Sequence, residues 1–367
     1  MMGPGTQRST TLTLLALLAA CLVAAMLLAA ACGGGGTATT DGGGDEGLQD
    51  NSGDGTQLTL LDWGGYDTPE FRGPWDETHP DVKLNWVFAN SDAEMFSKMR
   101  TGFDCDTVRP TWLRIYHDAD LIQPIDTSKI SNWANVNPTL AEVMNYDGEQ
   151  YYVPTTWGFS AILYRTDKVT EPITSWADLW RPDLKGKVSV FDSGDVAVAM
   201  TAAALGIDYK TASQEELDQI EQKLIELGPN VKNLWVDSVQ LDQQFAAGDI
   251  WVAAGAWSLS LLSAQDAGVP CEYVWPEEGM FSWAAGLGIS KTTKDYDLAL
   301  EFIDACLDPE AQAFIANSWG LGVGNDAAIP LIEPSLIEVL GLDDPDALFE
   351  QCIFLDPTEE ERTIYNE

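Results

Sequence analysis

Histidine and basic residues are scarce in this 367-residue chain. It contains 2 His and 19 Lys plus Arg, against 58 Asp plus Glu, which gives a formal net charge of −39. Nucleic acids and anionic membrane surfaces bind clusters of basic residues, so the composition argues against both partners. The acidic excess attracts cationic ligands, but it is also typical of a surface solvated in a salty or acidic habitat. We favour the second interpretation.

Enzyme and metal-site motifs are also missing. The chain has no G-x-S-x-G, P-loop, dinucleotide-binding glycine pattern or H-E-x-x-H motif. Neither His79 nor His117 has a Ser or Cys partner in the pattern, and no CxxC or Cys/His spacing indicates zinc. We therefore expect no enzyme, no cofactor and no metal. The alternative is an extracellular hydrolase with paired carboxylates, although pairs are common among 58 acids.

Cysteine is limited to six residues, of which Cys21 and Cys32 lie near the N-terminus. An extracellular location permits disulfide bonds between the others. Four cysteines allow three connectivities, and the spacing does not choose among them. The remaining four are Cys105, Cys271, Cys306 and Cys352.

One long apolar run is present, from Thr11 to Ala31, and a single charge, Arg8, precedes it. This pattern is typical of a secretory signal peptide. The sequence LAAAC (28–32) resembles the lipobox of bacterial lipoproteins, in which the peptide is cut before a lipidated cysteine. We expect residues 1–31 to be the signal peptide and Cys32 to carry the lipid.

Two alternatives to Cys32 stay open. The apolar run is long enough to span a bilayer as an uncleaved anchor, since about 20 residues suffice. LAAC (18–21) is a second lipobox, but cleavage there would leave an apolar stretch after the lipid. Residues 32–56, rich in Gly, Asp and Thr, are typical of a flexible tether and favour Cys32.

Strand-like and helix-like segments alternate from residue 57 onward. The remaining 311 residues (367 − 56) are too many for one comfortable core and suit two lobes. Ser213 and Glu216 form a capping-box pattern ahead of a helix with one apolar face. Such alternation predicts α/β layers with largely parallel sheets. The predicted strands are 58–62 and 82–88, both expected to be buried, and 233–236, 250–255 and 272–275.

Aromatic residues follow several of these strands, at the point where a strand opens into a loop. Ligands in open α/β sheets bind just beyond the carboxyl ends of the strands. Any single Trp is more often a packing residue, but several at strand ends favour a stacking or cation–π pocket. The aromatics in question are Trp63, Tyr66, Trp112, Trp257 and Trp283.

Several stretches, in order along residues 58 to 330, resemble those of the spermidine/putrescine-binding proteins. These are substrate-binding components of ABC importers. The longest is TSWADLWRP (174–182), which continues through KGK (185–187). The others are LDWGGY (61–66), LIQPID (121–126), YVPTTWG (152–158) and VWPEEG (274–279).

The resemblance implies an α/β, two-lobe type II periplasmic binding protein fold with a ligand cleft at the hinge. Lobe 1 would comprise residues 57–160 and 286–330, and lobe 2 residues 161–285 and 331–367. The implied protein is an extracytoplasmic, lipid-anchored monomer in the periplasm or at the cell surface. It would deliver a small-molecule ligand to an ABC permease.

Ligand-binding positions carry over only in part. The five aromatics named above match the family's aromatic positions, and Gln351 matches a glutamine near the C-terminus. The acids expected to bind ammonium fall on Ser193, Val196 and Ala285, and an expected tyrosine falls on Leu321. Acids nearby that could substitute are Asp195, Asp192, Asp62 and Asp67. The predicted site residues are Trp63, Tyr66, Trp112, Ser193, Asp195, Trp257, Trp283 and Gln351.

A polyamine or similar organic cation is the ligand that this resemblance implies. The loss of the expected acids leaves a quaternary ammonium, a zwitterion or a sugar as alternatives, because an aromatic pocket suits each of them. Ferric iron is a weaker alternative that rests on Tyr151 and Tyr152, a pair better explained by strand packing.

Overall fold

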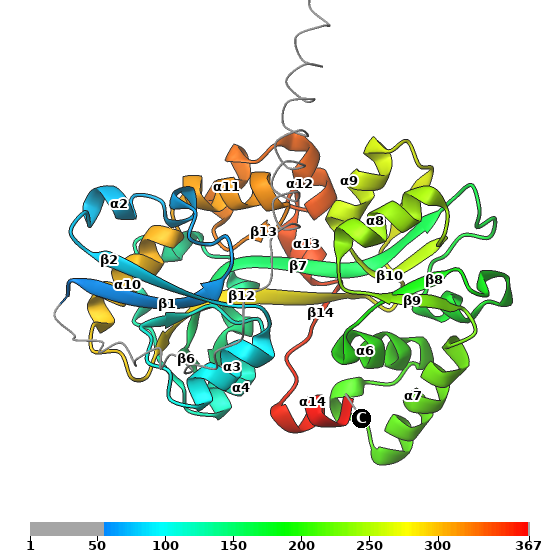
Figure 1. Ribbon diagram of the computed structural model, residues 1–367, viewed down its shortest axis with the longest axis horizontal. Coiled ribbons are helices and arrows are strands. Elements are labelled where there is room, and N and C mark those ends of the chain that lie inside the picture. The colour runs from blue at the N-terminus through cyan, green and yellow to red at the C-terminus, as the bar shows by residue number, and fades with distance from the viewer. Residues whose placement is uncertain (1–54, 366–367) are drawn as a thin grey trace, which may run out of the picture. The chain divides into compact units, whose positions relative to one another are not determined.

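The computed structural model describes residues 55–365, in which strands and helices alternate along the chain (Figure 1). The predicted signal peptide, Cys32 and nearly all of the predicted tether lie outside the described residues. No helix within residues 55–365 has the length and apolarity needed to cross a membrane.

One mixed sheet of 12 strands is the centre of the fold, and a separate pair, β5 (Asn145–Tyr146) and β6 (Glu149–Gln150), lies apart from it. The main order is β2-β1-β3-β12-β7-β10-β8-β9; β11 and β13 pair with β7, while β4 and β14 pair with β12. The strands are β1 (Gln57–Trp63), β2 (Lys83–Ala89), β3 (Thr107–Val108), β4 (Ile122–Gln123), β7 (Tyr152–Arg165), β8 (Val188–Phe191), β9 (Val231–Trp235), β10 (Val252–Trp257), β11 (Cys271–Val274), β12 (Met280–Ser290), β13 (Gly322–Val323) and β14 (Cys352–Phe354).

Helices cover both faces of this sheet. The α-helices are α2 (Trp75–Thr78), α3 (Asp92–Arg100), α4 (Leu113–Asp118), α5 (Pro138–Val143), α6 (Gly194–Leu205), α7 (Gln214–Leu227), α8 (Ser238–Ala247), α9 (Ser258–Asp266), α10 (Tyr296–Cys306), α11 (Pro309–Trp319), α12 (Pro334–Leu340), α13 (Pro345–Phe349) and α14 (Glu359–Tyr365). Short 3-10 helices span Pro69–Arg72, Thr127–Lys129, Trp133–Asn135, Trp176–Trp180, Pro182–Leu184, Tyr209–Thr211 and Asp326–Leu331.

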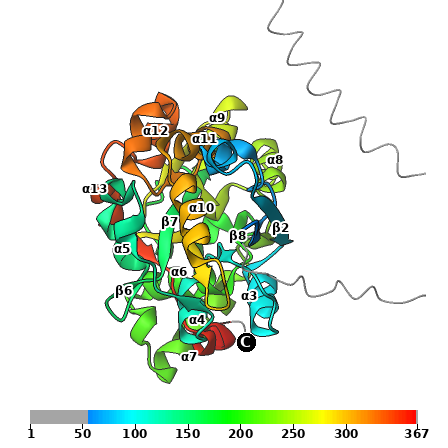
Figure 2. The same ribbon diagram turned by 90° about the vertical axis from the view of Figure 1, so that its left-hand side faces the viewer.

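The first lobe is built on the parallel strands β2, β1 and β3. Side chains alternate across a strand, so Leu58 and Leu60 of β1 pack with α10, while Leu61 packs with α3 and α4 on the other face. Figure 2 shows α10 and the α3–α4 pair on different sides of this part of the sheet. The lobe is therefore a three-layer α/β sandwich.

The second lobe repeats this plan with the parallel strands β10, β8 and β9. Val252 and Ala254 of β10 pack with α6 and α7, whereas Ala253 and Ala256 pack with α8 and α9. Figure 1 shows these two helix pairs on opposite sides of the strands. The predicted capping box at Ser213 and Glu216 is confirmed at the start of α7, with both of its hydrogen bonds formed.

The long strands β7 and β12 join the lobes and are antiparallel to each other. The prediction of largely parallel sheets is therefore right within each lobe and wrong for these two strands. The reason is topological, because the chain enters the second lobe along β7 and returns along β12. Since the sheet is continuous through both strands, the residue boundaries given above for the lobes stay a prediction.

One further expectation is corrected by the structure. The strand predicted at 82–88 exists as β2, but only Ala89 is buried in it, because β2 is the edge strand of the sheet. The sequence left the pairing of the four later cysteines open, and within the described residues all four are free.

A buried ion pair ties the end of β1 to β7. Arg109 Nε donates to both carboxylate oxygens of Asp62 at 3.0 Å, and its Nη1 donates to Thr155 Oγ1 at 2.6 Å. The side chains of Arg109 and Asp62 are only 2% and 1% exposed. Trp63 joins this network, since its indole N–H donates to the Arg109 carbonyl at 2.8 Å. The ion pair therefore fixes β1 relative to β7 and also positions Trp63, the first aromatic residue of the predicted site.

Replacing Asp62 with Ala is expected to lower the free energy of unfolding by about 3–5 kcal/mol, because Arg109 would remain buried without its counter-charge. The matched control, Asp76→Ala, breaks the Arg72–Asp76 pair, whose carboxylate is 51% exposed, and is expected to change stability by at most about 1 kcal/mol. Urea unfolding of the purified protein measures both values. Equal effects of the two substitutions would contradict this assignment.

Candidate functional site

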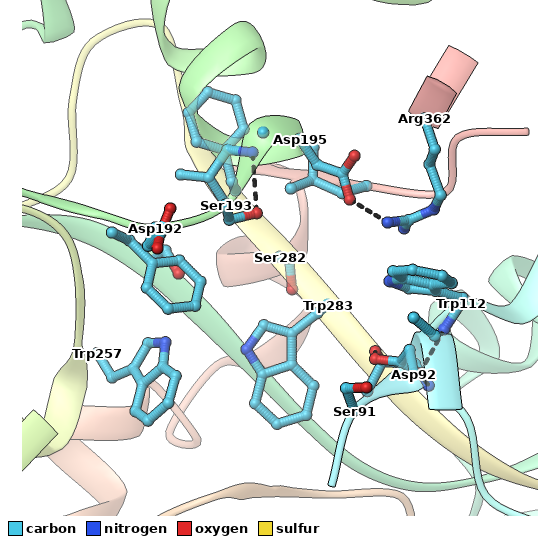
Figure 3. Close-up of a pocket in the computed structure, with 18 of the residues that line it drawn as sticks. Ser91, Asp92, Trp112, Asp192, Ser193, Asp195, Trp257, Ser282, Trp283 and Arg362 are labelled. Atoms are coloured by element: carbon cyan, nitrogen blue, oxygen red, sulfur yellow. Dashed lines mark hydrogen bonds and ion pairs between the residues drawn. The ribbon is translucent and has the colours of Figure 1, made fainter. Parts of the chain in front are cut away.

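A cavity of about 820 Å³ lies where the strands of both lobes end (Figure 3). Trp63 from the end of β1 and Trp112 from the loop after β3 line it on the first-lobe side. Trp257 from the end of β10 lines it on the second-lobe side, and Trp283 comes from the crossing strand β12. The remaining lining includes Asn90, Ser91, Asp92, Thr111, Ser160, Phe191, Asp192, Ser193, Asp195, Val196, Phe281, Ser282, Leu355 and Arg362.

Six of the eight predicted site residues therefore lie at one cavity. Their contribution to ligand binding stays a prediction, but their placement brings together side chains that are far apart in the sequence. They are Trp63, Trp112, Ser193, Asp195, Trp257 and Trp283. Asp192 also lines the cavity, whereas Asp62 is engaged in its ion pair with Arg109 and Asp67 is not part of the lining.

The structure places Tyr66 and Gln351 away from the cavity lining. Tyr66 is 7% exposed, its hydroxyl lies 3.3 Å from Thr156 Oγ1, and the Arg109 guanidinium lies over its ring at 4.2 Å. Gln351 is exposed, and its amide donates to the Ala347 carbonyl at 3.3 Å. Both side chains thus support neighbouring backbone and packing rather than the cavity.

The Trp283 indole lies across the neighbouring strand at Gly158. The two residues are register partners in the β12–β7 pair, and a Cβ at Gly158 would come within 2.6 Å of Trp283 Cζ2. A side chain at this position would displace the ring, so the glycine creates the space that the indole fills. Trp257 is held from a different direction, with its ring 5.5 Å from Trp235 and 5.8 Å from Phe191.

Ser193 and Asp195 reach the cavity through the start of α6. The Ser193 hydroxyl accepts from the Val196 N–H at 3.4 Å and caps the helix. This capping role is sufficient to account for a serine at position 193, whether or not it contacts a ligand. Asp195, in the first turn, forms an ion pair with Arg362 of α14. Burial raises the pKa of Asp195, and the Arg362 charge acts in the opposite direction.

Asp92 is a lining residue that the sequence analysis did not identify. It accepts hydrogen bonds from the Thr111 N–H at 2.8 Å, the Thr111 hydroxyl at 2.5 Å and the Trp112 N–H at 3.3 Å. It thus fixes the loop that carries Trp112, and burial raises its pKa despite these bonds. Ser91 caps the helix that starts after β2, and its hydroxyl accepts from the Glu94 N–H. This capping serine is the sequence signal that could have indicated Asp92.

Arg362 is the second residue that sequence reasoning missed. It lies in α14 near the end of the chain, and its guanidinium carbon is 3.8 Å from the centroid of the Trp112 ring. No local pattern places a C-terminal helix at a cleft formed by residues far earlier in the sequence. Three aspartates and one arginine thus line the cavity, an excess of two negative charges when all are ionised.

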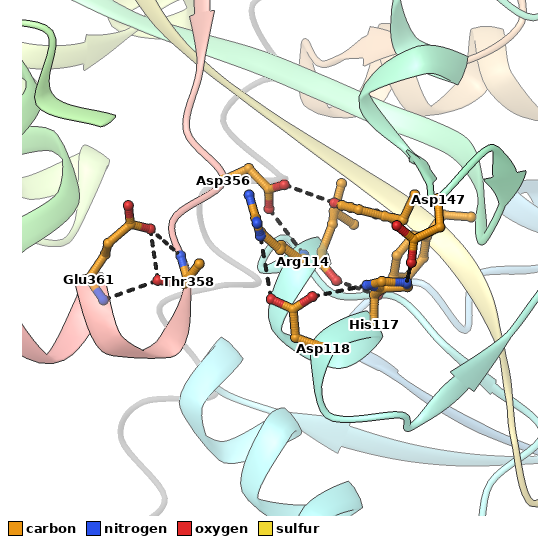
Figure 4. Close-up of polar contacts among 10 residues, drawn as sticks. Arg114, His117, Asp118, Asp147, Asp356, Thr358 and Glu361 are labelled. Carbon is orange, nitrogen blue, oxygen red and sulfur yellow. Dashed lines mark hydrogen bonds and ion pairs between the residues drawn. The ribbon is translucent and has the colours of Figure 1, made fainter. Parts of the chain in front are cut away.

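The histidines lie away from this cavity. His79 stacks on Trp75 at 3.9 Å and contacts Glu301, while His117 contacts Asp118 and Asp147 (Figure 4). Within residues 55–365, no group of three or more His, Cys, Asp or Glu side chains is arranged to hold a metal ion. The arrangement at the cavity is suited to stacking and charge pairing of a bound molecule.

Comparisons with known sequences show which proteins this chain is similar to. Residues 74–335 match the family model described as bacterial extracellular solute-binding protein. The spermidine/putrescine-binding periplasmic protein of Salmonella typhimurium is 28% identical over 291 residues, which cover 78% of this chain and 82% of that relative.

Solved structures share the fold. The spermidine/putrescine ABC transporter substrate-binding protein of Streptococcus pneumoniae has a TM-score of 0.71 and 23% identity, covering 85% of this chain and 96% of that one. A lipoprotein of Treponema pallidum has a TM-score of 0.68 and 22% identity, covering 84% and 97%. The fold is thus the two-lobe periplasmic binding protein fold. The chain belongs to the bacterial extracellular solute-binding protein family, and it is a solute-binding receptor rather than an enzyme.

Proposed function

We propose that this receptor binds a polyamine such as spermidine or putrescine, or a similar organic cation, and delivers it to an ABC permease. The observation that carries the proposal is the cavity itself, where four tryptophans and three aspartates face one space. The similarity to the Salmonella protein, whose name gives spermidine and putrescine as ligands, supports the same ligand class.

The aromatic side chains suit both parts of an amine. Indole faces attract cationic groups by about 0.5–2 kcal/mol and also cover a methylene chain with apolar surface. An ammonium that leaves water for a cleft needs charge-assisted hydrogen bonds in exchange. Asp92 and Asp192 supply carboxylates for such bonds, in place of the acids that the family resemblance leads one to expect at Ser193, Val196 and Ala285, whereas Asp195 is already paired with Arg362.

The position of the cavity suits a closing mechanism. Its walls come from both lobes, while β7 and β12 pass between the lobes as continuous strands. Bending at these strands would bring Trp112 and Trp257 toward each other around a ligand, as in other hinge-closing proteins. The bound, closed form is then the form that a permease can distinguish from the empty one.

Isothermal titration calorimetry of the protein without residues 1–32 is expected to show saturable binding of putrescine and spermidine. Trp257→Leu and Trp283→Leu should each weaken binding by about 2- to 30-fold, the loss of one cation–π contact. Trp275→Leu, at a tryptophan that is 39% exposed and outside the cavity lining, is the control and should bind normally. No heat and no thermal shift with either amine would exclude the polyamine proposal.

Amine affinity is expected to fall as the pH falls toward the raised pKa of Asp92. This pKa lies above the ordinary 3.8 because the carboxyl group is buried, and only the ionised form attracts a cation. The loss should thus begin at a higher pH than for an exposed aspartate. Calorimetry across a pH series measures it, and Asp92→Asn should flatten the profile. An unchanged profile in that variant would argue against Asp92 as a ligand group.

Lipid attachment at Cys32 is part of the proposal, and the lipoprotein of Treponema pallidum among the structural relatives is consistent with it. In a bacterial expression host, Cys32→Ser is expected to abolish incorporation of labelled palmitate and to release the protein from the membrane fraction. Cys21→Ser is the matched control and should remain labelled. Loss of label in the Cys21 variant alone would assign the lipid to the other lipobox.

A further inference from the structure

The C-terminal helix places a cation of the protein itself inside the cavity. Arg362 projects from α14, forms an ion pair with Asp195 of α6 and lies 3.8 Å above the centroid of the Trp112 ring (Figure 3). Its side chain is only 11% exposed and that of Asp195 only 13%. A guanidinium is therefore sandwiched between an indole face from the first lobe and a carboxylate from the second.

Contacts outside the cavity hold this segment in position. Asp356 accepts from the Arg114 N–H at 3.0 Å and from the Tyr146 hydroxyl at 2.9 Å. Thr358 and Glu361 exchange hydrogen bonds that cap α14 (Figure 4). Upstream, β14 pairs in parallel with β12 at Met280–Ser282. The location of Arg362 thus follows from the packing of its own segment.

An aromatic face together with a carboxylate is also the pair of groups that binds an ammonium or guanidinium ligand. Trp112 and Asp195 consequently form a cation subsite, and Arg362 occupies it. At the other side of Trp283, Figure 3 shows Trp257 and Asp192, which Arg362 does not reach in that view. The cavity therefore has one end filled by an internal cation and one end that presents aromatic and acidic groups.

We propose that Arg362 is a specificity-determining residue, which fills the subsite of Trp112 and Asp195 and so disfavours a second cationic group on the organic amine that the cleft takes. This inference rests on the proposed function, in which the cleft takes an organic cation. A monoamine places its ammonium near Asp192 and Trp257 and its apolar end toward Arg362. A diamine with the same carbon chain brings a second positive charge toward the Arg362 guanidinium, and the two like charges repel each other.

Butylamine and putrescine test the proposal, because they share a four-carbon chain and differ in one amine. Calorimetry is expected to show that the unaltered protein binds butylamine at least as tightly as putrescine. In Arg362→Gln, the affinity for putrescine relative to butylamine should rise tenfold or more, whereas Arg362→Lys keeps the original ratio. The control is Arg100→Gln. It breaks the 2.5 Å contact between Arg100 and Glu359, which lies in α14 like Arg362 but outside the cavity lining, and it should leave the ratio of putrescine to butylamine affinity unchanged. An equal ratio in the unaltered protein and Arg362→Gln would overturn the proposal.

A second measurement is independent of the cargo. Millimolar methylguanidinium is expected to raise the melting temperature of Arg362→Gln in a saturable way and by more than that of the unaltered protein, because the variant also offers the subsite of Trp112 and Asp195. Adding Asp195→Asn to Arg362→Gln should abolish this additional rise, which is the rescue of the vacated subsite. If this rescue is seen but no amine binds the unaltered protein, the subsite is supported and the proposed polyamine function fails. If amines bind but folded Arg362→Gln shows no rescue, the proposed function is supported and the role of Arg362 is refuted.

Discussion

The antiparallel pairing of β7 with β12 is the constraint on which the rest of the architecture depends. The two strands run 14 and 11 residues, and their register extends from Ser160 opposite Phe281 to Tyr152 opposite Gly288. A shift by one residue would turn every side chain of β12 to the opposite face. This register sets Trp283 against Gly158 and brings Ser160 and Ser282 to the cavity. The same backbone hydrogen bonds therefore connect the lobes and position the site.

Two of the cavity aspartates lie at the start of helices. Asp92 is in the first turn of α3 and Asp195 in the first turn of α6, where the helix dipole favours negative charge. Burial works against ionisation at both positions and raises both pKa values. Burial and the helix dipole oppose each other, and the nearby charge of Arg362 adds an interaction that stabilises the ionised form of both carboxyl groups. Under the proposed function, a bound organic cation acts in the same direction.

Local patterns allowed five of the strands, the capping box of α7 and most of the aromatic lining to be predicted, because strand ends and helix starts have short-range signals. The longest family-like stretch has a structural role: Trp176 donates to the Gly279 carbonyl at 2.9 Å, and Ser175 contacts Glu278 at 2.5 Å. It therefore indicates the fold and carries little information about the ligand. Tyr66 lies outside the cavity lining, and a match in sequence alone does not tell whether a ring faces a cavity or Arg109.

Arg362 could not be predicted, since its position depends on the course of the chain after β14, which brings α14 against α6. Its presence also changes how the charge of the protein is interpreted. A net charge of −39 over the whole chain would suggest a site that takes the most highly charged cation available. Exposed charges are screened by salt within about 10 Å, whereas the ion pair of Arg362 with Asp195 is shielded from solvent. Under the proposed function, selectivity among cations is therefore decided by the few charges that line the cavity, and one of these carboxylates, Asp195, is already paired with Arg362.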